Sequence, residues 1–174
     1  MRQMLRRPDA RRGLNGLGAL TCAGLIGFAY YLQYAQGLPP CPLCILQRIA
    51  FLLLALVFLV AAAHAPRGVG RWGYVLLLLM VGGAGGAIAG RHVYLQHLPA
   101  DQVAACGPDL GYIVSSLPLL EALEVILRGS GSCAATQWTW LSLSIPDWAL
   151  LWFVVLTVGG VLVNGIRPVP SPPR

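Results

Sequence analysis

The sequence contains no lysine and few acidic residues. All 12 of its basic residues are arginine, and only 6 residues are Asp or Glu. Charged residues make up 10% of the 174 positions, well below the quarter that is usual in soluble domains. Since 57% of the residues are hydrophobic, this composition excludes an ordinary soluble domain and indicates an integral membrane protein.

Motifs of several functional classes are also absent. The chain has no haem-attachment motif and no cysteine run typical of iron–sulfur proteins. The stretch "GVGRWG", residues 68–73, matches a dinucleotide fingerprint, but no predicted strand precedes it, so we read it as a loop. No basic face interleaved with aromatic residues is present, which argues against a nucleic-acid partner despite the net charge of +6.

Four apolar stretches are long enough to cross a hydrocarbon core about 30 Å thick as helices. They cover residues 14–32, 45–64, 73–92 and 147–165. The first is too long for the apolar region of a signal peptide and no small-residue cleavage site follows it, so we expect it to be retained. The predicted fold is therefore an all-α membrane protein, a single domain over residues 1–174 built as a four-transmembrane-helix bundle.

The arginines predict which side of the membrane each connection faces. Segments 1–13, 65–72 and 166–174 carry nine of them, which places these segments in the cytoplasm by the positive-inside rule. Segments 33–44 and 93–146 then lie on the opposite side. The longer of these includes "SSLPLLEALEVILRGSG", which predicts a short helix that Gly129 ends and that lies along the membrane interface.

Two further patterns concern packing. Glycines four residues apart in the third span predict a flat helical stripe that lets a neighbouring helix approach closely; these are Gly82, Gly86 and Gly90. Tryptophans bracket the start of the fourth span, as in an interfacial aromatic belt; these are Trp138, Trp140, Trp148 and Trp152.

Four of the five cysteines are predicted to face away from the cytoplasm. Cys22 falls in the middle of the first span, where a thiol is ordinary packing. Cys41 and Cys44 form a C-x-x-C pair at the start of the second span, a position that favours the thiolate and hence thiol–disulfide exchange. Cys106 and Cys133 lie in the long segment, where a structural disulfide is one interpretation and a zinc site made by all four cysteines is another.

Arg48 lies inside the apolar zone, one helical turn below Cys44 and on the same face. A charged side chain there costs on the order of 2.5–3.5 kcal/mol, so it marks a site unless it extends to the head groups. Its guanidinium is suited to hold the Cys44 thiolate or to donate hydrogen bonds to a carbonyl oxygen. A lipid-dissolved quinone fits, because it takes two electrons, as a dithiol gives, and carries carbonyl oxygens.

These residues resemble the family of bacterial disulfide bond formation protein B over nearly the whole chain. The resemblance rests on "PCPLCILQR" at the second span, "AACGPD" in the long segment and "GSCAATQWTWLSLSIPDWALLW" before the fourth. It implies a multi-pass protein of the bacterial inner membrane with both termini in the cytoplasm and its redox cysteines facing the periplasm. It further implies an enzyme that reoxidises a periplasmic thioredoxin-like (DsbA-like) disulfide donor and passes the electrons to quinone, either ubiquinone or menaquinone.

The same resemblance implies roles for individual residues. Cys41 and Cys44 would reduce the quinone, while Cys106 and Cys133 would form the loop disulfide that the partner attacks. Arg48 would help to bind the quinone. His97, in "VYLQHLP", resembles a histidine that the family places near the quinone head group, although a plain interfacial histidine is the alternative.

The chain departs from the family pattern at Gln47, where family members often carry an acid, and this puts the local tuning of pKa values in doubt. Two other interpretations remain open. A quinone-linked redox protein of the epoxide-reductase type shares the general plan, although its C-x-x-C pair belongs to a late span. A heavy-metal membrane carrier would use the cysteines as soft ligands.

Overall fold

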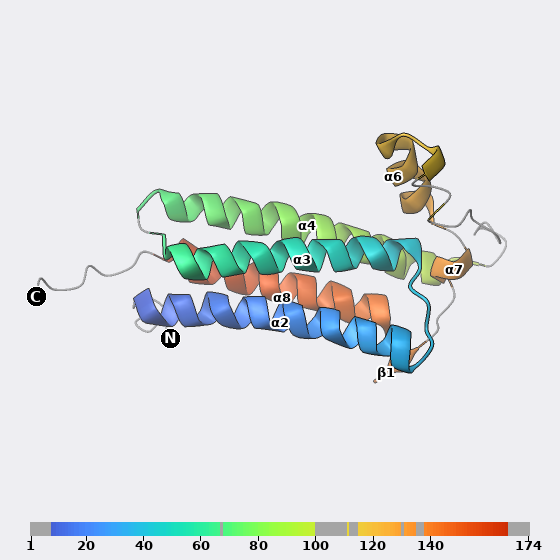
Figure 1. The fold of residues 1–174 in the computed structure, drawn as a ribbon, viewed down its shortest axis with the longest axis horizontal. Helices are drawn as coiled ribbons and strands as arrows, with labels where there is room; N and C mark the ends of the chain where they lie inside the picture. The colour runs from blue at the N-terminus through green and yellow to red at the C-terminus, as the bar shows by residue number, and fades with distance from the viewer. Residues whose placement is uncertain are drawn as a thin grey trace, which may run out of the picture.

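Four long helices lie side by side in the computed structural model of the protein (Figure 1). The structure describes residues 8–66, 68–99, 111, 115–129, 131–134 and 138–166. The long helices are α2 (Pro8–Ala35), α3 (Pro42–His64), α4 (Gly70–Gln96) and α8 (Ile145–Gly165), and each is long and apolar enough to cross a membrane. This confirms the predicted all-α bundle with four membrane-spanning helices.

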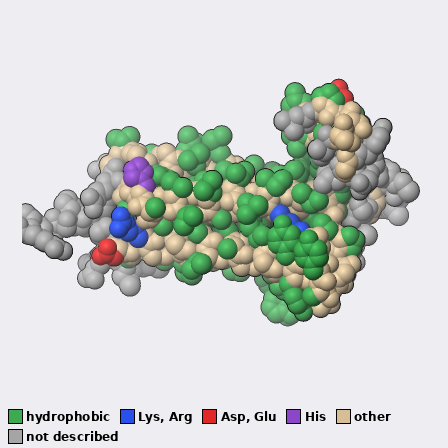
Figure 2. Space-filling model, in the orientation of Figure 1, with side chains coloured by type: hydrophobic (Ala, Val, Ile, Leu, Met, Phe, Trp, Pro, Cys, Tyr) green, Lys and Arg blue, Asp and Glu red, His purple; other side chains and the backbone are tan. Residues whose placement is uncertain are grey.

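The helices pack in a chain of neighbours, with α2 against α3, α3 against α4 and α4 against α8. The start of α2 and the end of α8 lie at one end of the bundle, and the short helices α6 (Leu119–Arg128) and α7 (Gly131–Ala134) lie at the other (Figure 1). Hydrophobic side chains cover much of the length of the bundle, and the charged side chains in view lie toward its two ends (Figure 2). Such a surface suits a bilayer, where lipid replaces water around the middle of the protein.

The middle of the bundle is filled by an apolar core. Its best-defined contact is the stack of Phe51 on Phe153, with ring centroids 3.9 Å apart and planes inclined by 10°. Cys22 is fully buried in this same core, in agreement with its interpretation as a packing residue.

Glycines allow α4 and α8 to approach closely, but at different positions from the predicted stripe. A Cβ atom at Gly82 would collide with Thr157, and one at Gly85 would collide with the Phe153 ring. At Gly86 the nearest atom would be 3.9 Å away, and Gly90 faces open space. The close contact therefore follows Gly82 and Gly85, because the packed face of α4 alternates steps of three and four residues.

At the end of the bundle formed by the start of α2 and the end of α8, two buried asparagines bond to each other. Asn15 Nδ2 donates to Asn164 Oδ1 at 3.2 Å, and Asn164 Nδ2 donates to Asn15 Oδ1 at 2.9 Å. Arg11 Nε donates to the carbonyl oxygen of Val163 at 3.2 Å, near the end of α8. These bonds hold α2 to α8, because buried polar groups in an apolar medium are stable only when they are paired.

The segment before α8 forms a small hairpin that the sequence did not predict. Strands β1 (Thr139–Trp140) and β2 (Leu143–Ser144) pair antiparallel around Leu141 and Ser142, whose φ angles are 53° and 63°. Helix α8 then begins with the Asp147 carboxylate accepting the Ser144 backbone N–H at 2.9 Å. Two-residue hairpin turns with positive φ usually contain Asn, Asp or Gly. Leu141 and Ser142 are none of these, so the turn could not be recognised from the sequence.

Helix α6 falls within the short helix predicted for the long segment and ends at Gly129, whose φ is +83°. Its buried residues Ala122 and Ile126 join a second apolar cluster with Leu43, Leu95 and two of the cysteines. The orientation of α6 along a membrane interface stays a prediction. Its packing shows instead how the long segment is attached to the ends of α3 and α4.

Candidate active site

The C-x-x-C pair forms the first turn of α3. Cys41 is the N-cap residue in an extended conformation, and Pro42 follows as the first helical residue, where its fixed φ suits the start of a helix. The Cys44 backbone N–H donates to Cys41 Sγ at 3.3 Å, so a cysteine sulfur takes the place of the usual capping oxygen. Both thiols are thus held together at the positive end of the helix dipole.

The two thiols are free and lie in contact. Cys41 Sγ donates toward Cys44 Sγ across 3.0 Å. Hydrogen bonding with Cys133 and then with Cys44, together with burial, raises the pKa of Cys41. Cys41 therefore keeps its proton and donates it in the hydrogen bond to Cys44 Sγ.

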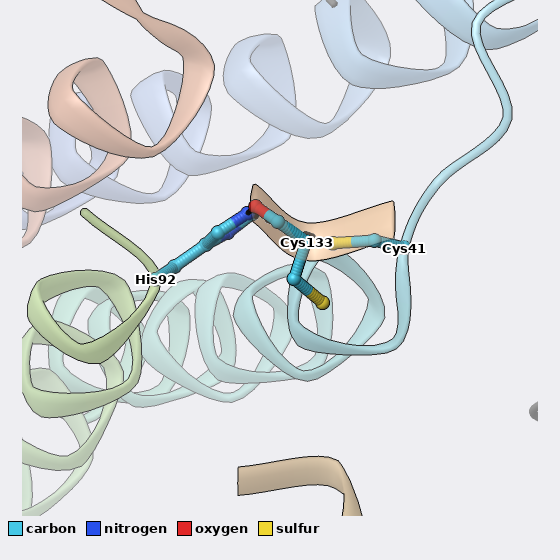
Figure 3. A group of neighbouring side chains, drawn as sticks. All are labelled: Cys41, His92 and Cys133. Atoms are coloured by element: carbon cyan, nitrogen blue, oxygen red, sulfur yellow. Dashed lines mark hydrogen bonds between the residues drawn. The ribbon is translucent and has the colours of Figure 1, made fainter. Parts of the chain in front are cut away.

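Cys133 lies next to this pair, although it is far away in the sequence. It belongs to α7, is fully buried, and packs in the same cluster as Cys41. The sulfur atoms of Cys41 and Cys133 and a ring nitrogen of His92 all lie within 4.8 Å of one another (Figure 3). The structure thus brings together three of the four cysteines predicted to be active, while Cys106 lies outside the described residues.

His92, which the sequence analysis ranked below His97, lies at the site. Its Nε2 atom lies 3.7 Å from Cys41 Sγ and 3.0 Å from the backbone oxygen of Cys133, and its Nδ1 lies 3.0 Å from Gln47 Nε2. The side chain is only 3% exposed. Leu78, Gly82, Gly85 and Ala89 form the buried face of α4 and His92 continues that row, whereas the predicted glycine stripe indicated a different face.

His97 lies elsewhere. It is exposed at the C-cap of α4, and its Nδ1 atom bonds to the backbone oxygen of Val93 at 2.8 Å. It is not among the residues that line the cavity described below. Its quinone role stays a prediction, and the structure places His92, five residues earlier, beside the thiols instead.

Arg48 extends from α3 toward α2. Its Nη1 donates to Gln33 Oε1 at 2.5 Å and its Nη2 to the Ala29 backbone oxygen at 3.1 Å. The guanidinium carbon also lies 5.0 Å from the centre of the Tyr30 ring. A guanidinium carries five N–H donors in a rigid fork. The α2 contacts therefore fix its plane and leave further donors for a ligand.

A cavity of about 570 Å³ opens beside the C-x-x-C pair. Its walls are mostly apolar and aromatic. They come from the four long helices and from the segment before α8, and they include all four tryptophans that were predicted to form an interfacial belt. The polar groups that reach it are Cys41, Cys44, Gln47, Arg48, His92 and Gln96. This size and this pattern, a large apolar surface with a few placed polar groups, are typical of small-molecule sites.

Arg91 attaches the Cys133 segment to α4. Its Nε donates to the Leu127 backbone oxygen at 3.1 Å and its Nη2 to the Arg128 backbone oxygen at 3.2 Å. These carbonyls belong to the last turn of α6, where backbone oxygens have no partner within the helix. The bonds hold α6 against α4 and so place α7, with Cys133, over the start of α3.

Comparisons with known proteins all identify the same family. The family model for "Disulfide bond formation protein DsbB" matches residues 11–163. Disulfide bond formation protein B of Marinobacter nauticus is 49% identical over 152 residues, which are 87% of this chain and 90% of that protein. The proteins of the same name from Hahella chejuensis and Nitrosococcus oceani are 52% and 51% identical over 79% and 82% of this chain, and each match covers 84% of the relative.

Proposed function

Because the chain belongs to the family of disulfide bond formation protein DsbB, we propose that it is a protein-dithiol:quinone oxidoreductase of the bacterial inner membrane. Family membership makes it a disulfide bond formation protein with several membrane spans. The finer proposal is that it takes two electrons from a periplasmic thioredoxin-like donor of the DsbA type. It then passes them to ubiquinone or menaquinone.

One observation carries this proposal. The Cys133 sulfur lies within 4.8 Å of the Cys41 sulfur, and the C-x-x-C pair borders the cavity. Thiol–disulfide exchange needs an attacking sulfur next to the disulfide sulfur that it attacks. The packing of α6 and α7 supplies this proximity between two segments that are distant in the chain.

The proposed relay consists of two exchanges. The reduced partner attacks a Cys106–Cys133 disulfide through a mixed disulfide and leaves oxidised, so both loop cysteines become thiols. Cys133 then attacks Cys41 of a Cys41–Cys44 disulfide, which forms a Cys41–Cys133 bond and releases Cys44 as a thiolate. Cys106 attacks Cys133 in turn, restoring the loop disulfide and leaving Cys41 and Cys44 reduced.

The cavity residues fit a quinone. The apolar walls suit a lipid-soluble ring, and Arg48 offers N–H donors for a carbonyl oxygen. When bound, a quinone accepts the two electrons and two protons that the dithiol gives up. The sulfur atoms of Cys41 and Cys44 lie 3.0 Å apart at the start of α3, so the pair is placed to close to a disulfide.

The proposed orientation follows from the charges. The end of the bundle at which α2 starts and α8 ends, next to the arginine-rich segments 1–13, 65–72 and 166–174, would face the cytoplasm. The site at the start of α3 would then face the periplasm, an oxidising compartment in which disulfides persist.

Replacing Cys44 tests the order of electron flow. In Cys44→Ser the C-x-x-C pair cannot form a disulfide, so we expect oxidation of the reduced partner by quinone to fall to the background rate. A partner variant that keeps only its attacking cysteine should still be captured as a mixed disulfide, because the loop pair acts earlier. The measurements are steady-state oxidation of the reduced partner and non-reducing gel electrophoresis.

The matched control is Cys22→Ser, which changes a buried thiol in the apolar core far from the site. Its turnover should stay near that of the wild type once the protein is shown to be folded. Quinone reduction at the wild-type rate by Cys44→Ser would show that electrons do not pass through Cys44 and would refute the proposed order.

A further inference from the structure

We infer that the reduced protein holds one soft d¹⁰ metal ion, with Zn²⁺ as the reference case, between Cys41, His92 and Cys133. The three donor atoms come from the start of α3, from α4 and from α7, and Figure 3 shows the three residues side by side, with the His92 ring at the Cys133 backbone oxygen. All three residues are buried. The site shares residues with the proposed function, but its existence does not depend on that function.

The spacing of the donor atoms suits a tetrahedral ion. Zinc binds thiolate sulfur at about 2.3 Å and imidazole nitrogen at about 2.0–2.1 Å, so neighbouring ligands in a tetrahedron lie roughly 3.6–3.8 Å apart. Cys41 Sγ and His92 Nε2 are separated by 3.7 Å, and the whole set lies within 4.8 Å. Small side-chain adjustments therefore suffice to close the three donors around an ion.

The charge and hydrogen-bond balance also fit. Two thiols release two protons when they bind Zn²⁺, and two thiolates with a neutral imidazole give a complex with no net charge, as a buried site requires. Gln47 lies 3.0 Å from His92 Nδ1. With its amide oxygen turned to that nitrogen it accepts Nδ1–H, which leaves Nε2 free to coordinate in place of its bond to the Cys133 oxygen.

Cys44 is not a required ligand. Its sulfur does not belong to the set of donor atoms that all lie within 4.8 Å of one another. The adjoining cavity provides a route for the ion and leaves its fourth position to water. Binding should also depend on the redox state, because a disulfide at Cys41 or at Cys133 removes a thiolate.

The test uses the full-length protein in detergent, reduced anaerobically with a phosphine that is then removed. Zinc is titrated in competition with a chromophoric chelator, and Co²⁺ is added separately to read the thiolate-to-metal charge-transfer absorption. We expect one ion per reduced chain and none per chain after oxidation. Cys133→Ser and His92→Phe should each weaken zinc binding more than about tenfold, since losing a ligand costs at least as much as losing its outer-shell partner.

Two matched variants keep the test decisive. Cys22→Ser and Cys44→Ser should each bind zinc within a few fold of the wild type, because neither supplies a required ligand. Unchanged binding in folded Cys133→Ser would place the ion on the C-x-x-C pair alone, and equal binding by the oxidised protein would place it away from the thiols; either result overturns the inference. Zinc binding is measured separately from turnover. A protein that binds no zinc but still oxidises its partner would refute this site and leave the proposed function intact.

Discussion

Arg48 of α3 is hydrogen-bonded to α2, and this contact allows its charge and its shape to be tested separately. Its guanidinium is held by Gln33 and the Ala29 oxygen of α2 while it lines the cavity beside Cys44. Lysine keeps the charge but loses the planar fork, so Arg48→Lys should raise the apparent KM for quinone, and Arg48→Ala should raise it further. A hydrogen bond from a charged donor contributes about 1.5–3 kcal/mol, or roughly ten- to a hundredfold in affinity.

The measurement is steady-state oxidation of the reduced partner at varied quinone concentration, in variants shown to be folded. The KM for the partner should hardly change, because Arg48 lies one helical turn further into the bundle than the thiol pair. Unchanged KM for quinone and unchanged turnover in both variants would leave Arg48 as an anchor between α3 and α2 and would move the quinone site elsewhere.

The two histidines near the end of α4 provide a matched pair. His92→Phe removes the bond from Nε2 to the Cys133 oxygen, which helps to keep Cys133 beside Cys41. A hydrogen bond contributes about 1 kcal/mol, so exchange between these cysteines should slow roughly fivefold or more. His97→Phe changes an exposed side chain outside the cavity and should leave turnover within about twofold. Turnover at saturating quinone measures both variants, and a greater loss in His97→Phe would restore the sequence-based interpretation.

Residue identities at the site could be predicted only where they depend on local sequence. The C-x-x-C pair at a helix start and the arginine one turn below it follow from helical spacing, and both are found there. The contact of Cys133 with Cys41 could not be predicted, because it depends on how α6 and α7 pack on α3 and α4. The choice between His92 and His97 required knowing which face of α4 is buried, and family resemblance alone did not decide it.

At the scale of helices, the contact between α4 and α8 depends on individual glycines. A side chain at Gly85 would collide with the Phe153 ring, which itself stacks on Phe51. Gly85→Val should therefore lower the free energy of unfolding by about 1–3 kcal/mol, the usual cost of overpacking. Gly90→Val is the control, since a Cβ there meets nothing within 4 Å. Thermal unfolding in detergent gives the melting temperature of each variant. Equal melting temperatures for Gly85→Val and Gly90→Val would contradict the close contact between α4 and α8 at Gly85.

The long helices were predictable because a membrane demands about 20 apolar residues in a row, and this requirement is visible in one segment at a time. The helices extend beyond the predicted apolar stretches, because their polar ends continue the backbone hydrogen bonding: α2 starts at Pro8 and α3 at Pro42. The hairpin before α8 could not be predicted, because the positive φ angles of Leu141 and Ser142 are set by pairing of the flanking strands rather than by turn residues.

At the scale of the whole molecule, polar chemistry is separated between the two ends of an apolar bundle. One end joins α2 to α8 through Arg11, Asn15 and Asn164, and the other carries the thiols, His92 and the helix α6. Cys41 and Cys133, which are far apart in the sequence, therefore meet at one end. The thiols of the proposed relay lie at that end, and the apolar middle separates them from Arg11 at the other end.

This separation makes the orientation testable by labelling. In a background where the five native cysteines are replaced by serine, a cysteine at Leu141, exposed in the hairpin turn, should react with a membrane-impermeant maleimide added to intact spheroplasts. A cysteine at Val69, which is 85% exposed in the connection between α3 and α4, should react only after the membrane is permeabilised. The reason is that Arg67 and Arg71 flank Val69, and arginine-rich connections are retained in the cytoplasm.

Labelling is read as a mass shift on gels. Reaction at position 69 in intact spheroplasts, with protection at position 141, would invert the proposed orientation and put the thiol pair in the reducing compartment, where it could not serve a periplasmic partner.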